Sequence, residues 1–319
     1  MSKARELSQR AGVDGALSNR NKVINGSFLV WQRSDSAYAN SGYASVDRFM
    51  MTRGRIRKPN TEGYTGEDNT GAVFDCMDGG IYSHFDYYIE DIGQKLHGKT
   101  MTLSFKMKSL TGSSESLYLE QTGTDAFDFG GSTYITVPTE WTTFTFTGTV
   151  VSTGHVGGVH LMRWYLNPTG SSAVSKRLQI DEVQFEEGDT VTPFEHRSFC
   201  QELALCQRFF EKSYPYDVAL GAYNGSTIAL IANYYLGYLY GGSVEYIVEK
   251  RTAPTLQIWS YAGHGSNWHR GYNGYNETLT TSITLSNNSA RRFNPYISGA
   301  SSQDNVMYGH WAADAELYG

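Results

Sequence analysis

The chain has 319 residues, of which 40% are hydrophobic and only 18% are charged, so it can bury a core beneath a surface that carries little charge. Its formal net charge of −6 argues against a nucleic-acid partner, and no apolar run approaches the ~18 residues that would indicate insertion in a membrane. Aromatic residues make up 14% and glycine occurs 34 times, a composition that favours strands and tight turns over helices.

The first 20 residues are polar and contain no apolar segment. They lack the apolar core of a secretory signal, and the three cysteines are an odd number, which suits synthesis in a reducing cytoplasm. Polar N-terminal segments are most often disordered, and the alternative is an attachment peptide that becomes ordered on a partner.

The following segment, residues 21–194, has the features of one β domain. Residues 101–108 and 142–150 alternate between apolar and polar side chains, which predicts half-buried antiparallel strands. Residues 178–188 alternate in two halves that are offset by one position, which predicts a β-bulge at Asp181–Glu182. Short strands separated by Gly, Ser and Asn turns indicate a β-sandwich or jelly roll.

A short helix is predicted within residues 195–213. Ser198 and Gln201 have the spacing of a capping box. An apolar stripe at helical spacing then consists of Phe199, Leu203, Cys206 and Phe210. So apolar a helix predicts either contact between copies of the chain or packing between two domains of one subunit.

Residues 214–319 return to short strands and turns, which predicts a second β domain, a C-terminal β-sandwich, and an all-β chain with one linking helix. Within this domain, residues 260–277 combine Gly, Asn, His and aromatic side chains in a loop-like stretch. Aromatic rings stack on sugar rings while amides bind sugar hydroxyls, so this stretch predicts glycan binding; the alternative is that the rings fill a domain edge or a subunit interface. The candidate glycan-binding residues are Trp268, Tyr272 and Tyr275, supported by Trp259, Tyr261 and His269.

Signatures of catalysis are lacking: no G-x-S-x-G, H-E-x-x-H, Walker A or dinucleotide-binding motif occurs. Glycoside hydrolysis needs two carboxylates roughly 5 to 9 Å apart. Asp125 with Asp128, or Asp181 with Glu182, could supply such a pair, but so could most acidic sequences. We therefore expect that the protein is not an enzyme.

Four tracts follow one another between residues 23 and 188: VINGSFLVWQR, GKTMTLSFKMKS, EWTTFTFTGTV and LQIDEVQFEEG. They resemble the jelly-roll carbohydrate-binding modules of polysaccharide-degrading enzymes. That resemblance implies a structural calcium ion, held partly by a glutamate just after N-G-x-F and partly by the closing aspartate. Asn25 and Asp181 match, whereas Leu29 occupies the position of the glutamate. No other cofactor is implied.

A second resemblance covers essentially the full chain. The tracts INGSFLVWQR and YASVDRF, the long VQFEEGDTVTPFEHRSFCQELALCQRFFEKS, and the later VEKRTAPTLQIWS and WAADAEL are similar to tail-fibre and receptor-binding proteins of tailed bacteriophages. The opening MSKARELSQRAG is similar to the segment that joins such fibres to the virion.

This resemblance implies a homotrimer in the virion tail. Residues 1–20 would bind tail or baseplate proteins, residues 21–194 would form a jelly roll, residues 195–213 would organise the trimer, and residues 214–319 would bind a host surface polysaccharide. Weak sugar contacts become firm when several copies bind at once. Two alternatives remain, a glycan depolymerase and a structural tail adaptor that never contacts the host.

Overall fold

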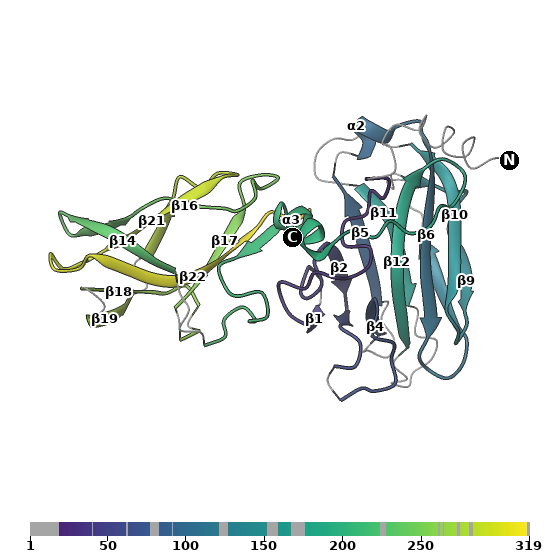
Figure 1. The fold of residues 1–319 in the computed structure, drawn as a ribbon, viewed down its shortest axis with the longest axis horizontal. Coiled ribbons are helices and arrows are strands. Elements are labelled where there is room, and N and C mark those ends of the chain that lie inside the picture. The colour runs from purple at the N-terminus through teal and green to yellow at the C-terminus, as the bar shows by residue number, and fades with distance from the viewer. Residues whose placement is uncertain are drawn as a thin grey trace. The chain divides into compact units, whose positions relative to one another are not determined.

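The computed structural model describes all residues except 1–18, 40, 62, 77–82, 91, 121–126, 152–158, 167–175, 224–227, 261, 264, 273–274, 281–282 and 318–319. The predicted attachment peptide therefore lies outside the described residues, apart from its last two. The described chain is all-β with short helices, which confirms the predicted fold class (Figure 1). No helix in the described part of the chain is long and apolar enough to cross a membrane.

The chain divides into two compact units between Glu202 and Leu203, inside the predicted linking helix. The second unit also includes Gln32–Ser34, and the first also includes Leu317–Gly319.

The first unit is a sandwich of two antiparallel sheets. One sheet contains seven strands in the order β1 (Ser36–Ala39), β3 (Gly54–Arg57), β4 (Ala72–Cys76), β12 (Arg177–Glu187), β6 (Thr100–Ser109), β10 (Thr142–Val150) and β8 (Phe127–Asp128). The other contains five, in the order β2 (Phe49–Thr52), β5 (Ser83–Ile89), β11 (Val159–Leu166), β7 (Glu115–Glu120) and β9 (Thr133–Val137).

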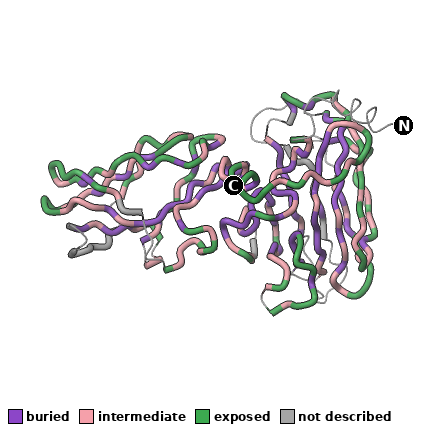
Figure 2. The backbone as a smooth tube through the Cα atoms, in the orientation of Figure 1, coloured by how far each residue is buried: buried purple, intermediate pink, exposed green. Residues whose placement is uncertain are grey.

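An aromatic stack joins the two sheets of the sandwich. Phe74 of β4 stacks on Phe85 of β5 with ring centroids 3.7 Å apart, and Phe85 stacks on Trp164 of β11 at 4.6 Å. Phe105 of β6 meets the edge of Trp164 at 5.7 Å. Buried positions of this unit run along the strands of both sheets (Figure 2), so the core lies between the two layers.

The alternation predicted for residues 142–150 is confirmed by β10, whereas that for residues 101–108 is confirmed only in part, because Thr102 and Ser104 on the polar side of β6 are buried as well. The apolar positions of β6 are buried, and those of β10 pack against the same core. The predicted bulge is also confirmed, because the register of β12 on β6 shifts between Asp181 and Gln184. Glu182 within the bulge has a left-handed backbone, with φ of 52°.

Two short helices are described, α2 (Ile92–Leu96) and α3 (Phe199–Gln207). The predicted capping box at the start of α3 is confirmed. The Gln201 main-chain N–H donates to Oγ of Ser198 at 3.3 Å, and the Ser198 N–H donates to Oε1 of Gln201 at 2.9 Å. Two otherwise unpaired donors of the first turn are thereby satisfied.

The apolar stripe predicted for a trimer contact is only partly helical and only partly exposed. Phe210 lies in β13 (Phe210–Lys212), which pairs with β22 (Val306–Asp314), so its predicted place on the helix is wrong. Cys206 and Phe210 are buried within a single chain, so neither offers surface to another copy. Phe199 is 40% exposed and Leu203 is half-buried, and the predicted contact is reduced to this pair.

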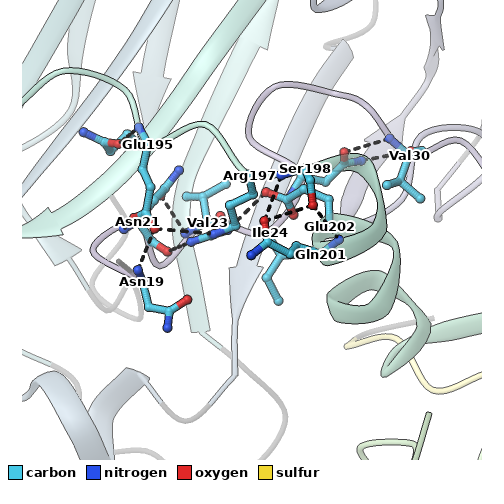
Figure 3. Close-up of polar contacts among 12 residues, drawn as sticks. Asn19, Asn21, Val23, Ile24, Val30, Glu195, Arg197, Ser198, Gln201 and Glu202 are labelled. Carbon is cyan, nitrogen blue, oxygen red and sulfur yellow. Dashed lines mark hydrogen bonds and ion pairs between the residues drawn. The ribbon is translucent and has the colours of Figure 1, made fainter. Parts of the chain in front are cut away.

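A buried polar cluster joins the start of the described chain to the segment before α3 (Figure 3). Arg197 donates to Oε1 of Glu202 at 3.1 Å and to the carbonyl oxygen of Asn21. Glu202 accepts the main-chain N–H of Asn25 at 2.8 Å, and Glu195 accepts that of Asn21 at 2.8 Å. The linking segment is thereby fixed to the first unit.

The second unit is built on one ten-stranded antiparallel sheet. Seven strands follow one another in the order β16 (Val244–Glu245), β21 (Arg292–Ser298), β15 (Tyr238–Gly241), β14 (Ile228–Tyr235), β22, β18 (Trp268–Tyr272) and β19 (Tyr275–Thr280). Three further strands join this path. β13 and β17 (Thr255–Trp259) pair with β22, and β20 (Ile283–Ser286) pairs with β21. The ring of Trp311 in β22 lies 5.5 Å from Tyr246 and 5.8 Å from Phe293 in β21. Strands distant in the sheet order therefore share one core.

Candidate functional site

The β14–β15 hairpin of the second unit turns through only two residues. Leu236 and Gly237 both have positive φ, 48° and 85°, which is the geometry of a type I′ turn. A left-handed backbone suits glycine but costs about 1–2 kcal/mol for a residue with a Cβ, so leucine is an unusual choice. Leu236 is also 73% exposed, so burial does not explain its presence.

The outward side of this hairpin and of the adjoining strands carries a row of tyrosines. Alternate residues of β14 and β15 face the core, as burial of Ala232 and Leu239 shows, so the intervening side chains face outward. We name this surface the tyrosine face; it consists of Tyr235, Tyr238, Tyr240 and Tyr296 with Asn233, Asn294, Thr284 and Ser298.

Three rings of the tyrosine face form one cluster. The ring centroids of Tyr238 and Tyr240 are 6.0 Å apart, those of Tyr240 and Tyr296 are 5.7 Å apart, and those of Tyr238 and Tyr296 are 6.2 Å apart. These separations fall within the ~4.5–7 Å range of favourable ring pairs. Tyr238 and Tyr240 nevertheless remain 41% and 43% exposed, so the rings hold one another in place and still present surface.

No member of the tyrosine face is charged. Charged side chains enter at the end of the face where Arg292 of β21 pairs in register with Glu245 of β16. Aromatic rings flanked by amides and hydroxyls on the outward side of a sheet can stack on the apolar faces of sugar rings and hydrogen-bond their hydroxyls. The surface therefore has the chemistry of a platform for a neutral, extended ligand.

Trp268, the first residue predicted to contact glycan, is instead a core residue, which corrects that prediction. Its side chain is 0% exposed and its Nε1 donates to the carbonyl oxygen of His310 at 3.0 Å. A Cβ on Gly309 would lie 2.1 Å from the indole, so the ring packs directly on this backbone. The physical reason is that residues 268–272 form β18 and pair with β22, whereas the sequence predicted a loop.

The supporting residues are also only partly available. His269 is 8% exposed in β18, and Trp259 is half-buried with its ring 6.0 Å from that of Tyr214. Tyr272 and Tyr275 pair across the β18–β19 hairpin, but their side chains lie outside the described residues, as does the whole of Tyr261. The prediction for these three tyrosines stays untested.

Sequence reasoning chose other residues of the second unit and missed the tyrosine face. The signal is present in residues 234–240, YYLGYLY, where tyrosines alternate on both sides of a Leu-Gly turn. Tyr296, from a distant part of the sequence, joins them only through pairing of β21 with β15.

The first unit has one smaller exposed aromatic pair on its five-stranded sheet. Tyr118 of β7 and Tyr134 of β9 pair in register, with ring centroids 4.7 Å apart, and Tyr134 is 65% exposed. The pair offers less ring surface than the tyrosine face, which makes Tyr134 a matched control for it.

The residues predicted to hold calcium do not fit that ion. Asn25 is 0% exposed; its Oδ1 accepts the N–H of Val30 at 2.9 Å, and its Nδ2 donates to the carbonyl oxygens of Val30 and Asp47. Its amide is therefore committed to the backbone, and the side chain of Leu29 supplies no oxygen. Among the described residues no cluster of three or more His, Cys, Asp or Glu side chains is suited to a metal.

Asp181, the other candidate ligand, is nearly buried at the bulge of β12. Its Oδ2 accepts the hydroxyl of Thr70 and its Oδ1 accepts the N–H of Glu182 at 2.8 Å. Burial raises the pKa of Asp181 above its usual 3.8, because these two hydrogen bonds offset only part of the cost of burying the charge. Its contribution to stability is therefore present below pH 3.8 and is lost as the pH rises through the raised pKa.

We expect Asp181→Asn to raise the free energy of unfolding at neutral pH and to leave it unchanged below pH 3.8. The amide can accept the Glu182 N–H and donate to Thr70 without burying a charge. Urea unfolding at the two pH values measures the difference, and the exposed Asp189→Asn serves as the control. Stabilisation of the wild type, but not of Asp181→Asn, by added calcium would instead restore Asp181 as a metal ligand.

No family model and no curated protein matches the chain. Similar solved structures include a CBM4 module, with 16% identity over 51% of this chain and 98% of that chain at a TM-score of 0.32. They also include TmCBM61 in complex with β-1,4-galactotriose, with 14% identity over 53% of this chain and 100% of that chain at a TM-score of 0.32. A third is the enzymatically active domain of bacteriophage CBA120 tailspike protein 4, with 17% identity over 53% of this chain and 22% of that chain at a TM-score of 0.32.

Proposed function

We propose that the chain is a receptor-binding fibre protein of a tailed bacteriophage, which binds a glycan of the host surface through the tyrosine face. The observation that carries the binding proposal is the cluster of exposed tyrosine rings on an uncharged sheet surface of the second unit. The bacteriophage assignment is supported by the sequence resemblance, above all by its long tract through residues 183–213.

The shape and chemistry of the tyrosine face favour a polysaccharide. The face extends over three adjoining strands, β14, β15 and β21, so a continuing sugar chain can lie across it, whereas a closed pocket would take a chain end. Tyrosine supplies both a ring that stacks and a hydroxyl that hydrogen-bonds. Asn233, Asn294 and Thr284 add further groups that can donate to and accept from sugar hydroxyls.

Binding in this proposal occurs without cleavage. Hydrolysis of a glycoside requires two carboxylates that flank the scissile bond, and the tyrosine face carries none. Affinity instead comes from repetition: a homotrimer held in the tail through residues 1–20 would present several tyrosine faces to one cell surface. Linked weak sites of this kind gain about 100- to 10,000-fold over one site.

Replacing two rings tests the proposal. We expect the variant Tyr240→Ala/Tyr296→Ala to lose about tenfold or more in affinity for a bacterial capsular or O-antigen polysaccharide, because each lost ring contact is worth ~0.5–1.5 kcal/mol. Affinity electrophoresis on a panel of such polysaccharides measures the loss, with Tyr134→Ala as the matched exposed-tyrosine control. Retention of the wild type by no polysaccharide, or equal retention of the double variant, would contradict the proposal.

Exposed Leu236 favours a second candidate function, in which the tyrosine face contacts another copy of the chain. Tyrosine is enriched in protein interfaces, and an apolar residue at a hairpin end suits such a contact. Light scattering separates the two candidates. A mass near three times 35.5 kDa that falls to 35.5 kDa in Tyr240→Ala/Tyr296→Ala would assign the face to self-association, whereas an unchanged mass would leave it to glycan.

A further inference from the structure

The turn of the β14–β15 hairpin extends past the long strand β22 of the second unit. The last pair in the register of β14 on β22 joins Ile231 to Val306. From that pair the chain continues to the turn at Leu236, a distance of ~16 Å at ~3.3 Å per residue. The carbonyl oxygen of Gly237 in the turn accepts the main-chain N–H of Ala300 at 3.0 Å, so the turn is braced by the segment that follows β21.

Both faces of the hairpin are exposed around this turn, and we name residues 234–238 the hairpin tip. Tyr235 lies on the outward face and is 64% exposed. Tyr234 lies on the same face as the buried Ala232 and is still 39% exposed, and Leu236 is 73% exposed. A ligand that lies on the outward face would leave Tyr234 and Leu236 uncovered. Only a partner that surrounds the hairpin tip covers all of these side chains.

The hairpin and the residues before it carry no charge. Residues 218–244 contain no Asp, Glu, Lys or Arg, although these residue types make up 18% of the chain. Asp304, in the segment that braces the turn, is paired with Arg270. Transfer of a charged side chain into hydrocarbon is costly. The hairpin tip can therefore leave water without taking a charge with it.

The side chains of the hairpin tip become more apolar toward its end. Leu236 lies in the turn, and Tyr235 and Tyr238 pair in register directly behind it. A tyrosine has an apolar ring and a polar hydroxyl, and this residue type is enriched where hydrocarbon meets water at a membrane surface. Interfacial segments insert their apolar side chains by roughly 5–10 Å. At that depth of Leu236, the two rings would lie at the level of the lipid headgroups.

The small size of the hairpin tip distinguishes a lipid surface from a protein partner. Its four large side chains are between 39% and 73% exposed, and a whole aromatic side chain offers ~150–250 Å². The tip therefore falls short of the ~800 Å² per partner that a stable protein interface buries. Binding to a membrane surface needs no such complementary area, because its strength scales with the apolar area that is inserted. The left-handed backbone of Leu236, with φ of 48°, adds strain of the kind that is concentrated at functional sites.

We propose that the hairpin tip inserts into the surface of a phospholipid bilayer, with Leu236 among the acyl chains and the flanking tyrosine rings among the headgroups. The contact is peripheral and does not cross the bilayer. It does not depend on glycan binding by the tyrosine face, whose Tyr240 and Tyr296 lie farther from the turn. Tyr235 and Tyr238 belong to both surfaces, so the decisive substitution is at Leu236.

Flotation of the full chain with phosphatidylcholine vesicles tests the proposal. We expect the wild type to float with the vesicles and Leu236→Asn to bind them about tenfold more weakly, because an amide gains nothing from insertion. Asparagine suits the left-handed turn position better than leucine, so the variant keeps the hairpin. Because the hairpin tip is uncharged, binding should persist in about 1 M salt, where the Debye length is only ~3 Å.

The matched control is Ile247→Asn, which removes another apolar side chain of the second unit, one that is 79% exposed. Ile247 follows β16, which pairs with the start of β21, whereas the hairpin tip adjoins the end of β21. This control should float as the wild type does, and Leu236→Asn should keep the wild-type affinity for polysaccharide.

Three results would overturn the proposal. The first is a wild type that does not float or that salt releases from the vesicles. The second is equal flotation of Leu236→Asn and the wild type. The third is a wild-type oligomer in light scattering that dissociates in Leu236→Asn, which would assign the hairpin tip to a second copy of the chain.

Discussion

Replacing Arg57 by methionine is expected to lower the free energy of unfolding of the first unit by about 3–5 kcal/mol, the usual cost of removing one partner of a buried ion pair. Arg57 is 0% exposed and holds two carboxylates. Its η nitrogens donate to Glu67, one at 2.7 Å, and its Nε donates to Oδ2 of Asp75 at 2.8 Å. Asp75 keeps Arg55 as a partner, whereas Glu67 loses its main one.

The gain in stability between acidic and neutral pH should become smaller in the same variant. Burial alone would raise the pKa of Glu67, but hydrogen bonds from Arg57 and Asn60 and the charges of Arg57 and Arg177 outweigh it and hold the pKa below 4.5. In the wild type this contribution to stability is present above pH 4.5 and is lost as the pH falls through the lowered pKa. Without Arg57, only the Asn60 N–H and the Arg177 charge oppose burial, so the pKa of Glu67 rises and less of this contribution remains above pH 4.5.

Urea unfolding across the acidic range, with hydrogen exchange to identify the unit that opens, measures both effects. The double variant Arg57→Met/Glu67→Gln removes the unpaired charge and should recover a large part of the lost stability. A matched surface control is Lys99→Met, whose exposed pair is worth about 0–1 kcal/mol. If Arg57→Met unfolds within ~1 kcal/mol of the wild type, the ion pair does not stabilise this part of the fold.

Features encoded by neighbouring residues were predictable from the sequence. The alternation of β10, the bulge at Asp181–Glu182 and the capping box of α3 each depend on residues within a few positions of one another. Their physical causes, side-chain periodicity and local hydrogen bonding, are visible in a short stretch of sequence.

Features decided by distant pairing were not predictable. The apolar spacing of α3 continues to Phe210, but pairing with β22, about a hundred residues later, makes Phe210 part of a strand. The glycine-rich and asparagine-rich stretch around Trp268 is typical of a loop, yet pairing with β22 again turns it into a buried strand. The tyrosine face likewise needs Tyr296, which joins Tyr240 only across β15 and β21.

In the second unit, Lys250→Met is expected to lower the free energy of unfolding by about 3–5 kcal/mol, for the same reason as Arg57→Met. The Lys250 side chain is 0% exposed and its Nζ donates to Glu211 of β13 and to the carbonyl oxygens of Gln207 and Val248. Glu211 also accepts the main-chain N–H of Ile247 at 2.9 Å. The pair thus fixes the segment around residue 250 to the strand that follows α3.

Keeping Lys250 charged in its buried position costs free energy. The same pair therefore carries a second prediction. Burial lowers the pKa of Lys250 below 10.5 even though Glu211 acts to raise it, so the unfolded chain holds the proton more tightly and stability rises with pH toward 10.5. Lys250→Met/Glu211→Gln removes both charges and keeps an acceptor for Ile247, so it should recover most of the loss. Hydrogen exchange of residues 246–251 in each variant measures the loss of stability and its recovery. If the double variant is no more stable than Lys250→Met, the destabilisation comes from the lost donor to Gln207 and Val248 and not from the unpaired carboxylate.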